Sequence, residues 1–295
     1  MELTIRELTK EFGDVTAVNK VAYTLSHGVY GLLGVNGAGK TTLMRMLCTL
    51  QKPTAGMITW DGRDIFTMDG EYRRLLGYLP QDFGYYPDFT VYDYLMYISA
   101  IKGIRPAAAR RRTETLLAQV GMSNAKHKKM KKLSGGMKRR VGIAQAMLGD
   151  PKILILDEPT AGLDPNERIR FRNLISEISG ERIVLLSTHI VSDVEYIANE
   201  ILLMKDGQII LSGTAEDLTA SMPGKVWSCE IPREQMESYL KTYKVANIKT
   251  TAAGAELRIL SEIQPTETAV LETTSLEDVF LHYFGEKAGD HDGTL

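Results

Sequence analysis

Short apolar runs alternate with longer amphipathic segments through most of this chain. Residues 28–34, 152–159 and 181–189 are rich in Val, Ile and Leu and are too short for typical helices, which indicates strands buried on both faces. Residues 42–50 and 166–179 instead place apolar side chains at helical spacing. This alternation predicts an α/β fold in which helices cover a parallel sheet.

Two segments that border this region have another pattern. Residues 1–13 and 201–213 alternate polar and apolar side chains and contain Gly-bearing turn signals. Alternation of this kind favours strands with one exposed face, so we expect antiparallel strands at the edges of the fold.

The pattern changes again toward the C-terminus and predicts a second, smaller domain. Residues 225–231 and 255–260 alternate like strands, and residues 233–243 have helical spacing. We therefore expect one domain over residues 1–218 and a small α/β accessory domain over residues 219–295.

A final helix is expected within residues 273–285. Thr274 is followed three residues later by Glu277, which is the spacing of a capping box at a helix start. The last ten residues, 286–295, are small, charged and polar, and we expect them to form a frayed tail.

Composition excludes several classes of protein. The formal net charge of the 295 residues is -2, which gives no bulk electrostatic case for a nucleic acid partner. Cys48 and Cys229 are the only cysteines and lie far apart in the sequence, which disfavours a disulfide scaffold and favours a reducing cytosol. The apolar runs are far shorter than the ~20 residues of a membrane helix. We expect a chain that does not cross a bilayer but can lie against a membrane protein.

The segment GVNGAGKTT, which begins at Gly34, carries the strongest chemical signal. It fits the pattern G-x-x-x-x-G-K-[ST] and lies between a predicted strand and a predicted helix. Gly34, Gly37 and Gly39 allow the backbone N–H groups to converge on phosphate oxygens. Lys40 then reaches the β- and γ-phosphates, and the Thr41 hydroxyl can bind Mg²⁺. A Gly-rich turn with a surface lysine is the alternative, and the flanking strand and helix argue against it.

An acidic pair follows the run ILIL at residues 153–156. A buried strand delivers Asp157 and Glu158 at its carboxyl end, where Asp157 can hold Mg²⁺ through water and Glu158 can polarise an attacking water. The pair could also simply cap the next helix. The guanine-reading pattern N-K-x-D does not occur, which disfavours a GTPase.

A second glycine-rich segment, LSGGMKRR, precedes the acidic pair. Ser134 can cap the following helix, and Gly135 and Gly136 form a second backbone nest. With this segment the sequence resembles the nucleotide-binding domain of ABC (ATP-binding cassette) transporters over roughly residues 1–215. The resemblance implies a P-loop NTPase core with an antiparallel β edge subdomain and a helical subdomain.

The remaining motifs of that family occur in its order along the chain. They include YLPQD at Gln81, AGLD at Asp164, LSTH at His189 and an aromatic residue at Phe12. The resemblance assigns ATP contacts to Phe12, Asn36, Gly37, Ala38, Gly39, Lys40, Thr41, Thr42, Ser134, Gly135, Gly136 and Asp164, catalysis to Glu158, His189 and Gln81, and metal contacts to Thr41, Gln81 and Asp157.

The resemblance also implies a dimeric mechanism in which two domains sandwich two ATP molecules. The phosphate loop of one chain faces the LSGG segment of the other. Phe12 then stacks on adenine, and Gln81 senses Mg²⁺ and the attacking water. His189 holds the γ-phosphate and orients Glu158, while Asp164 contacts the partner's loop. One chain carries one set of motifs, so it cannot close a site alone.

Each of these single residues also has a structural alternative. Phe12 could be a core aromatic, Gln81 a polar turn residue and His189 a structural histidine. Asp164 could only cap the helix that opens at Pro165. The family order of the motifs favours the functional interpretation in each case.

Two further surfaces are predicted with alternatives. Residues 83–97 hold five tyrosines and two phenylalanines, which suits a partner pocket, and in ABC proteins this segment abuts the transmembrane subunit. Core packing within the helical subdomain is the alternative. The basic runs at residues 110–112 and 126–132 are solvated faces by default, with attraction to anionic lipid as the alternative.

The sequence therefore predicts the ATPase subunit of an ABC transporter, and most resembles the stand-alone subunits of ABC-2-type exporters. The segment QDFGYYPDFTVYDYL, the separate chain and the ending SLEDVFLHYFG support this subclass over an importer. We expect ATP, Mg²⁺, a homodimer and separate transmembrane permease subunits, at the cytoplasmic face of the cell membrane. The alternatives are a soluble ABC ATPase acting on ribosomes or DNA and a cassette without hydrolysis.

Overall fold

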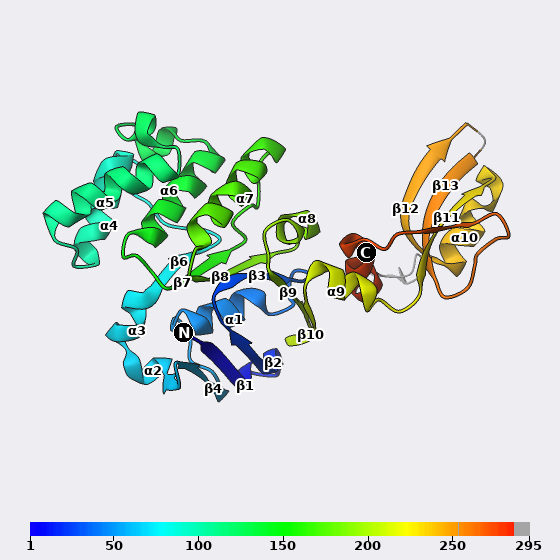
Figure 1. Cartoon of the computed structure of the whole chain (residues 1–295), viewed down its shortest axis with the longest axis horizontal. Coiled ribbons are helices and arrows are strands. Elements are labelled where there is room, and N and C mark those ends of the chain that lie inside the picture. The colour runs from blue at the N-terminus through cyan, green and yellow to red at the C-terminus, as the bar shows by residue number, and fades with distance from the viewer. Residues whose placement is uncertain (253, 286–295) are drawn as a thin grey trace. The chain divides into compact units, whose positions relative to one another are not determined.

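The computed structural model describes residues 1–252 and 254–285, in two compact units (Figure 1). The first unit is Met1–Ser212 and the second begins at Gly213. This division lies before the boundary expected at residue 218, because helix α9 (Ala215–Ala220) packs on α11 (Leu276–Phe284) of the second unit. The tail predicted at residues 286–295 lies outside the described residues.

A six-stranded sheet of order β10-β9-β3-β8-β7-β6 forms the centre of the first unit. Strands β6, β7, β8, β3 and β9 run parallel, which confirms the predicted parallel sheet. The strands are β3 (Gly28–Leu33), β6 (Leu76–Leu79), β7 (Ile153–Asp157), β8 (Ile183–Thr188), β9 (Glu200–Lys205) and β10 (Gln208–Gly213).

One detail of the edge prediction was wrong. The segment from 201 to 213 was expected to form antiparallel strands at the edge of the fold, yet β9 pairs with β3 in parallel. The residues of β9 from Ile201 to Met204 are all buried, so β9 is an inner strand, and of the two strands in this segment β10 alone lies at an edge of the sheet. The alternation that suggested an exposed face belongs to β10, whose burial alternates along the strand.

A separate antiparallel sheet of order β2-β1-β4-β5 contains the N-terminal segment, as predicted. Its strands are β1 (Leu3–Phe12), β2 (Val15–Leu25), β4 (Ala55–Trp60) and β5 (Arg63–Asp64). Helix α1 (Lys40–Leu47) contacts β2 of this sheet and β7 of the parallel sheet, so it lies between the two. One hydrophobic cluster joins them through residues such as Leu3, Leu43 and Ile155.

Helices complete the first unit. α4 (Val91–Ile101), α5 (Pro106–Gln119) and α6 (Gly135–Met147) pack on one another, and α8 (Val191–Glu195) packs on β3 and β8. The others are α2 (Ile65–Met68), α3 (Gly70–Leu75), α7 (Pro165–Ser179) and the 3₁₀ turns η1 (Ser123–Ala125) and η2 (Met130–Lys132). No helix within residues 1–252 and 254–285 has the length and apolar character needed to cross a bilayer.

The second unit is a small α/β structure. Its antiparallel sheet has the order β12-β13-β11-β14. Its elements are β11 (Lys225–Ile231), β12 (Lys244–Thr251), β13 (Gly254–Ser261), β14 (Val270–Glu272), η3 (Arg233–Gln235), α10 (Met236–Thr242), α9 and α11. Cys229, Ile231 and Leu257 belong to a hydrophobic cluster of its own.

The predicted capping box of the last helix was displaced by one residue. Ser275, not Thr274, caps α11, and Asp278, not Glu277, completes the box. The physical reason is burial: Asp278 is buried and also pairs with Arg258, whereas Glu277 is exposed.

Candidate functional site

The predicted phosphate loop follows β3 and leads directly into α1. Two of its glycines are required by close backbone contacts. A Cβ at Gly34 would lie 2.4 Å from the carbonyl oxygen of Met204, and one at Gly39 would lie 2.2 Å from that of Ala17. Gly39 also has a φ of 101°, in the left-handed region. The loop is therefore packed against its neighbours by backbone contacts that only glycine permits.

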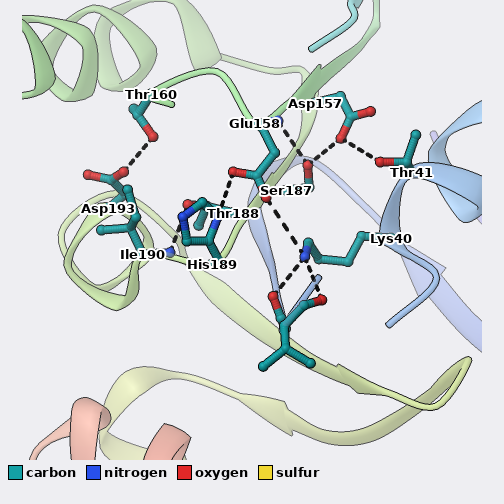
Figure 2. Close-up of polar contacts among 12 residues, drawn as sticks. Lys40, Thr41, Asp157, Glu158, Thr160, Ser187, Thr188, His189, Ile190 and Asp193 are labelled. Atoms are coloured by element: carbon teal, nitrogen blue, oxygen red, sulfur yellow. Dashed lines mark hydrogen bonds and ion pairs between the residues drawn. The ribbon is translucent and has the colours of Figure 1, made fainter. Parts of the chain in front are cut away.

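The loop lies at the carboxyl end of the parallel strands, where binding sites of open α/β sheets occur. β7 ends at Asp157 and β8 ends at Thr188, and Asp157 is paired with Ser187 across the sheet. Because neighbouring parallel strands end at the same edge, the acidic pair and the histidine that follow them meet the loop there (Figure 2).

A pocket of about 190 Å³ lies over this loop. It brings together residues that are distant in sequence, including Gln81 after β6 and Glu158 after β7. Its lining residues are Ala17, Asn36, Gly37, Ala38, Gly39, Lys40, Thr41, Thr42, Gln81 and Glu158. Apart from Ala17, all were predicted from the sequence as contacts for the nucleotide, the metal ion or water.

Lys40 is buried at the start of α1, and its amine points back into the loop. Nζ donates hydrogen bonds to the carbonyl oxygens of Gly34 (2.7 Å) and Val35 (3.1 Å). It also lies 3.8 Å from Oε1 of Glu158. Burial lowers the pKa of Lys40, and the nearby carboxylates of Glu158 and Asp157 oppose that shift. The Lys40 amine is thus held at the base of the loop by two backbone carbonyl oxygens and lies next to a buried carboxylate.

Thr41 and Asp157 meet at the side of the pocket, as a shared metal site requires. Oδ1 of Asp157 accepts hydrogen bonds from Oγ of Ser187 (2.7 Å) and from Oγ1 of Thr41 (3.3 Å). A hydroxyl and one carboxylate are oxygen donors of the kind Mg²⁺ takes alongside substrate phosphates. The described residues contain no cluster of three or more His, Cys, Asp or Glu side chains suited to a metal ion. The donor set therefore fits a magnesium ion that also binds phosphate.

Glu158 is held between Lys40 and His189. Its side chain is buried, and Oε2 lies 3.0 Å from Nδ1 of His189, which is about half exposed (Figure 2). Its backbone has a φ of 46°, which is unusual for a residue with a side chain and is common at functional sites. The backbone N–H of Glu158 donates to Oγ of Ser187 at 3.0 Å. A carboxylate fixed in this way at the pocket wall can accept a proton from a water molecule.

Three polar residues of this region were not predicted. Ser187 connects Asp157 to the backbone of Glu158. Thr160 and Asp193 form a buried hydrogen bond close by. The LSTH segment contains Ser187, so its position one strand from the acidic pair was a signal for its role. Nothing in the local sequence pointed to Thr160 or Asp193.

The LSGG segment is not part of this pocket. Ser134 caps α6, and its Oγ accepts from the backbone N–H of Met137 at 3.3 Å. Gly135 lines a different pocket, of about 240 Å³, together with Ala161, Gly162 and other residues. A Cβ at Gly136 would lie 2.6 Å from Oε2 of Glu167, whereas one at Gly135 would meet nothing within 4 Å.

Comparison with known proteins agrees with this arrangement. The family model described as "ABC transporter" matches residues 18–161. The ABC transporter ATP-binding protein YxlF of Bacillus subtilis (strain 168), itself uncharacterized, is 35% identical over 240 residues, which cover 81% of this chain and 79% of YxlF. The chain belongs to the ATP-binding proteins of ABC transporters.

Two further similarities extend over most of this ABC protein. The Nod factor export ATP-binding protein I of Burkholderia orbicola (strain AU 1054) is 33% identical over 307 residues, 98% of each chain. The solved structure of CbiO1 from Clostridium perfringens has a TM-score of 0.67 at 30% identity and covers 74% of this chain and 90% of CbiO1. The protein is therefore an ABC ATPase, the ATP-binding subunit of a transporter.

Two predicted residues of this ABC ATPase lie away from the pocket over the phosphate loop. Phe12 ends β1 and is 49% exposed, with Nζ of Lys10 at 5.2 Å from the ring centroid, so it is not a core aromatic. Asp164 caps α7 by accepting from the backbone N–H of Glu167 at 3.0 Å. The Phe12 ring and the Asp164 carboxylate are both exposed, and neither lines the pocket over the phosphate loop.

The aromatic segment of the ABC ATPase divides into a buried and an exposed part. Tyr94 is buried, in agreement with the packing alternative. Tyr86 and Tyr97 are exposed, and their rings meet edge-on with 5.3 Å between centroids. The centroid of Phe89 lies 4.9 Å from that of Tyr86 and 5.8 Å from that of Tyr97. Next to them is a groove of about 840 Å³ lined by Ile98, Ile101, Arg73, Arg74, Lys102 and other residues.

Proposed function

We propose that this ABC ATPase powers an ABC-2-type exporter as a homodimer bound to separate permease subunits at the cytoplasmic face of the membrane. The position of the LSGG segment is the observation that best supports the proposed dimer. Ser134, Gly135 and Gly136 are absent from the lining of the pocket over the phosphate loop. In the proposed dimer this segment covers ATP held on the partner's loop, so each site takes residues from both chains.

In the proposed reaction, the loop and Lys40 hold the phosphates, and Thr41 and Asp157 hold Mg²⁺. When bound, Mg²⁺ neutralises charge on the β- and γ-phosphates. Glu158 accepts the proton of the attacking water, and His189 orients Glu158 through their 3.0 Å contact and touches the γ-phosphate. Gln81, which lines the same pocket, positions that water near the metal.

The remaining predicted residues have proposed roles in the pocket, at its rim and at the dimer interface. The exposed ring of Phe12 stacks on the adenine base. Asp164 contacts the partner's phosphate loop. Asn36, Ala38 and Thr42 contribute loop contacts to the nucleotide.

The exporter assignment and the membrane partner have separate support. The Burkholderia relative is named for Nod factor export, and CbiO1 is part of the transporter complex CbiONQ. In this chain, the exposed aromatics Tyr86 and Tyr97 adjoin a groove with a basic rim. We propose that the groove and these rings receive a cytoplasmic segment of the permease.

A complementation experiment tests the shared site. Lys40→Ala removes the cation of the loop and leaves LSGG intact. Gly135→Asp places a negative charge where the partner's γ-phosphate is proposed to lie, and a Cβ at Gly135 meets no atom within 4 Å, so the fold has room for it. Each variant alone should be inactive. Mixed together they can form a dimer with one intact site, and phosphate release should reappear.

The matched control mixes Lys40→Ala with a chain that carries both substitutions, since that pair forms no intact site. Wild-type turnover by Gly135→Asp alone would show that each chain hydrolyses ATP without a partner's LSGG. The genes beside this one separate a transporter subunit from a soluble ABC ATPase, because a transporter subunit is expected to have a neighbouring gene for a six-span membrane protein.

A further inference from the structure

A buried hydrogen bond lies beside the pair formed by Glu158 and His189. Oγ1 of Thr160 donates to Oδ2 of Asp193, and both residues are about 1% exposed. Oδ1 of Asp193 accepts no hydrogen bond from the described part of the chain. Thr160 is therefore the hydrogen-bond donor on which the buried Asp193 carboxylate depends there.

This bond and the Glu158–His189 contact join the same two segments of chain (Figure 2). Thr160 follows Glu158 by two residues, and a tight turn fixes it, with Ala161 N–H donating to Glu158 O and Leu163 N–H to Thr160 O. Asp193 follows His189 by four residues in the first turn of α8. The two contacts are thus parallel connections between the segment after β7 and the segment after β8.

The two connections differ in how firmly they can hold. His189 is about half exposed, so water can replace its contact with Glu158. The Thr160–Asp193 bond is enclosed, and breaking it would leave a buried carboxylate without that donor. The buried bond is therefore the one suited to set the separation of the two segments.

We propose that Thr160 and Asp193 are positioning residues that hold Glu158 and His189 at the geometry required for hydrolysis. The proposal rests on the catalytic roles proposed above for Glu158 and His189. Neither Thr160 nor Asp193 lines the pocket over the phosphate loop, so they act through the segments they join and not by touching ATP. A small displacement of a catalytic group lowers turnover far more than it lowers substrate binding.

The test uses Thr160→Val, which removes the hydroxyl and keeps the shape of the side chain. We expect kcat to fall by about 10- to 100-fold while KM for ATP stays unchanged. Thr160→Ser retains the hydroxyl, and Asp193→Asn retains an acceptor oxygen. Each of these variants should therefore keep most of the wild-type kcat. Thr59→Val is the matched control, because Thr59 is a buried threonine of β4 with no hydrogen bond to its hydroxyl in the described residues. It should leave kcat unchanged.

A double-mutant cycle separates positioning from general destabilisation. Thr160→Val with Asp193→Ala should lower kcat no further than the worse single variant, because both remove one interaction. Effects on kcat that multiply, or a wild-type kcat in Thr160→Val, would overturn the proposal. Glu158→Gln is measured in parallel. If Glu158→Gln loses turnover while Thr160→Val keeps the wild-type kcat, only the positioning role is rejected. Wild-type turnover in Glu158→Gln rejects the catalytic assignment and the positioning role together.

Discussion

Nζ of Lys40 lies 3.8 Å from Oε1 of Glu158, and both side chains are buried at one wall of the pocket. The cation proposed to bind phosphate and the proposed base therefore belong to one electrostatic unit. Oε2 of Glu158 contacts His189 at the same time, so the carboxylate lies between two groups that are proposed to bind the γ-phosphate. A change at any one of the three residues should affect the other two.

Lys40→Ala should abolish measurable hydrolysis and weaken nucleotide binding. The variant removes the charge that meets the β- and γ-phosphates and also the cation beside Glu158. We expect phosphate release to fall by about 100-fold or more, as when one electrostatic contact to a developing charge is removed. Phosphate release and nucleotide titration on the purified variant measure both effects. Unchanged turnover would contradict the assignment of the phosphate loop.

Asp278→Asn should destabilise the second unit. Nε and Nη2 of Arg258 donate to its two oxygens at 3.0 and 2.7 Å. We expect the free energy of unfolding to fall by about 1–3 kcal/mol, since the loss leaves part of a buried charged network unpaired. Glu272→Gln is the control, because Oε2 of Glu272 is 3.8 Å from Nη1 of Arg258 and the Glu272 side chain is 44% exposed. It should change stability by about 0.5 kcal/mol or less in thermal unfolding.

The same pair predicts a pH dependence. Burial acts to raise the pKa of Asp278, but hydrogen bonds from Arg258 and Ser275 outweigh it and leave the pKa below its usual value. A lowered pKa in the folded state stabilises the fold above about pH 4 and ceases to do so as the pH falls further. The stability difference between the wild type and Asp278→Asn should therefore narrow in unfolding curves recorded below about pH 4. A constant difference down to pH 3 would contradict the assigned pairing.

The second unit should be dispensable for ATP binding. A chain that ends at Ser212 retains every residue of the pocket, and the removed part has a hydrophobic cluster of its own. We expect the shortened chain to fold and to bind ATP with the affinity of the full chain, and we expect the second unit to regulate or support the dimer. Precipitation or a large loss of affinity in nucleotide titration would contradict this division.

Much of the site could be predicted because its polar groups belong to short motifs of consecutive residues. The loop at Gly34, the LSGG segment and the acidic pair each combine a turn, a helix start or a strand end with fixed polar groups. Thr160 and Asp193 could not be predicted in this way, since they are single polar residues that only the meeting of β7 and β8 brings together.

The errors in the predicted fold also came from contacts between residues that are distant in the sequence. Thr274 and Ser275 both satisfy the local pattern of a helix cap, and the burial of Asp278 against Arg258 decides between them. A short polar turn joins β9 to β10, as in a hairpin at the edge of a sheet. The pairing of β9 with β3 is a contact between distant parts of the chain, and the local pattern of polar and apolar residues does not predict it.

Glu158→Gln tests whether two chains enclose ATP between them and separate after Glu158 catalyses its hydrolysis. Glutamine keeps the shape of the side chain but cannot accept the proton, so hydrolysis should fall by about 10²–10⁴-fold. Binding should survive, because Lys40, Thr41 and Asp157 are unchanged. Each trapped ATP contacts both chains and stabilises the closed dimer by mass action.

Size-exclusion chromatography with light scattering of the Glu158→Gln variant is the decisive measurement. We expect the mass of a dimer in ATP and Mg²⁺ and a shift toward the monomer in ADP. The same mass in both nucleotides, together with wild-type turnover, would contradict both the role of Glu158 and the shared ATP site.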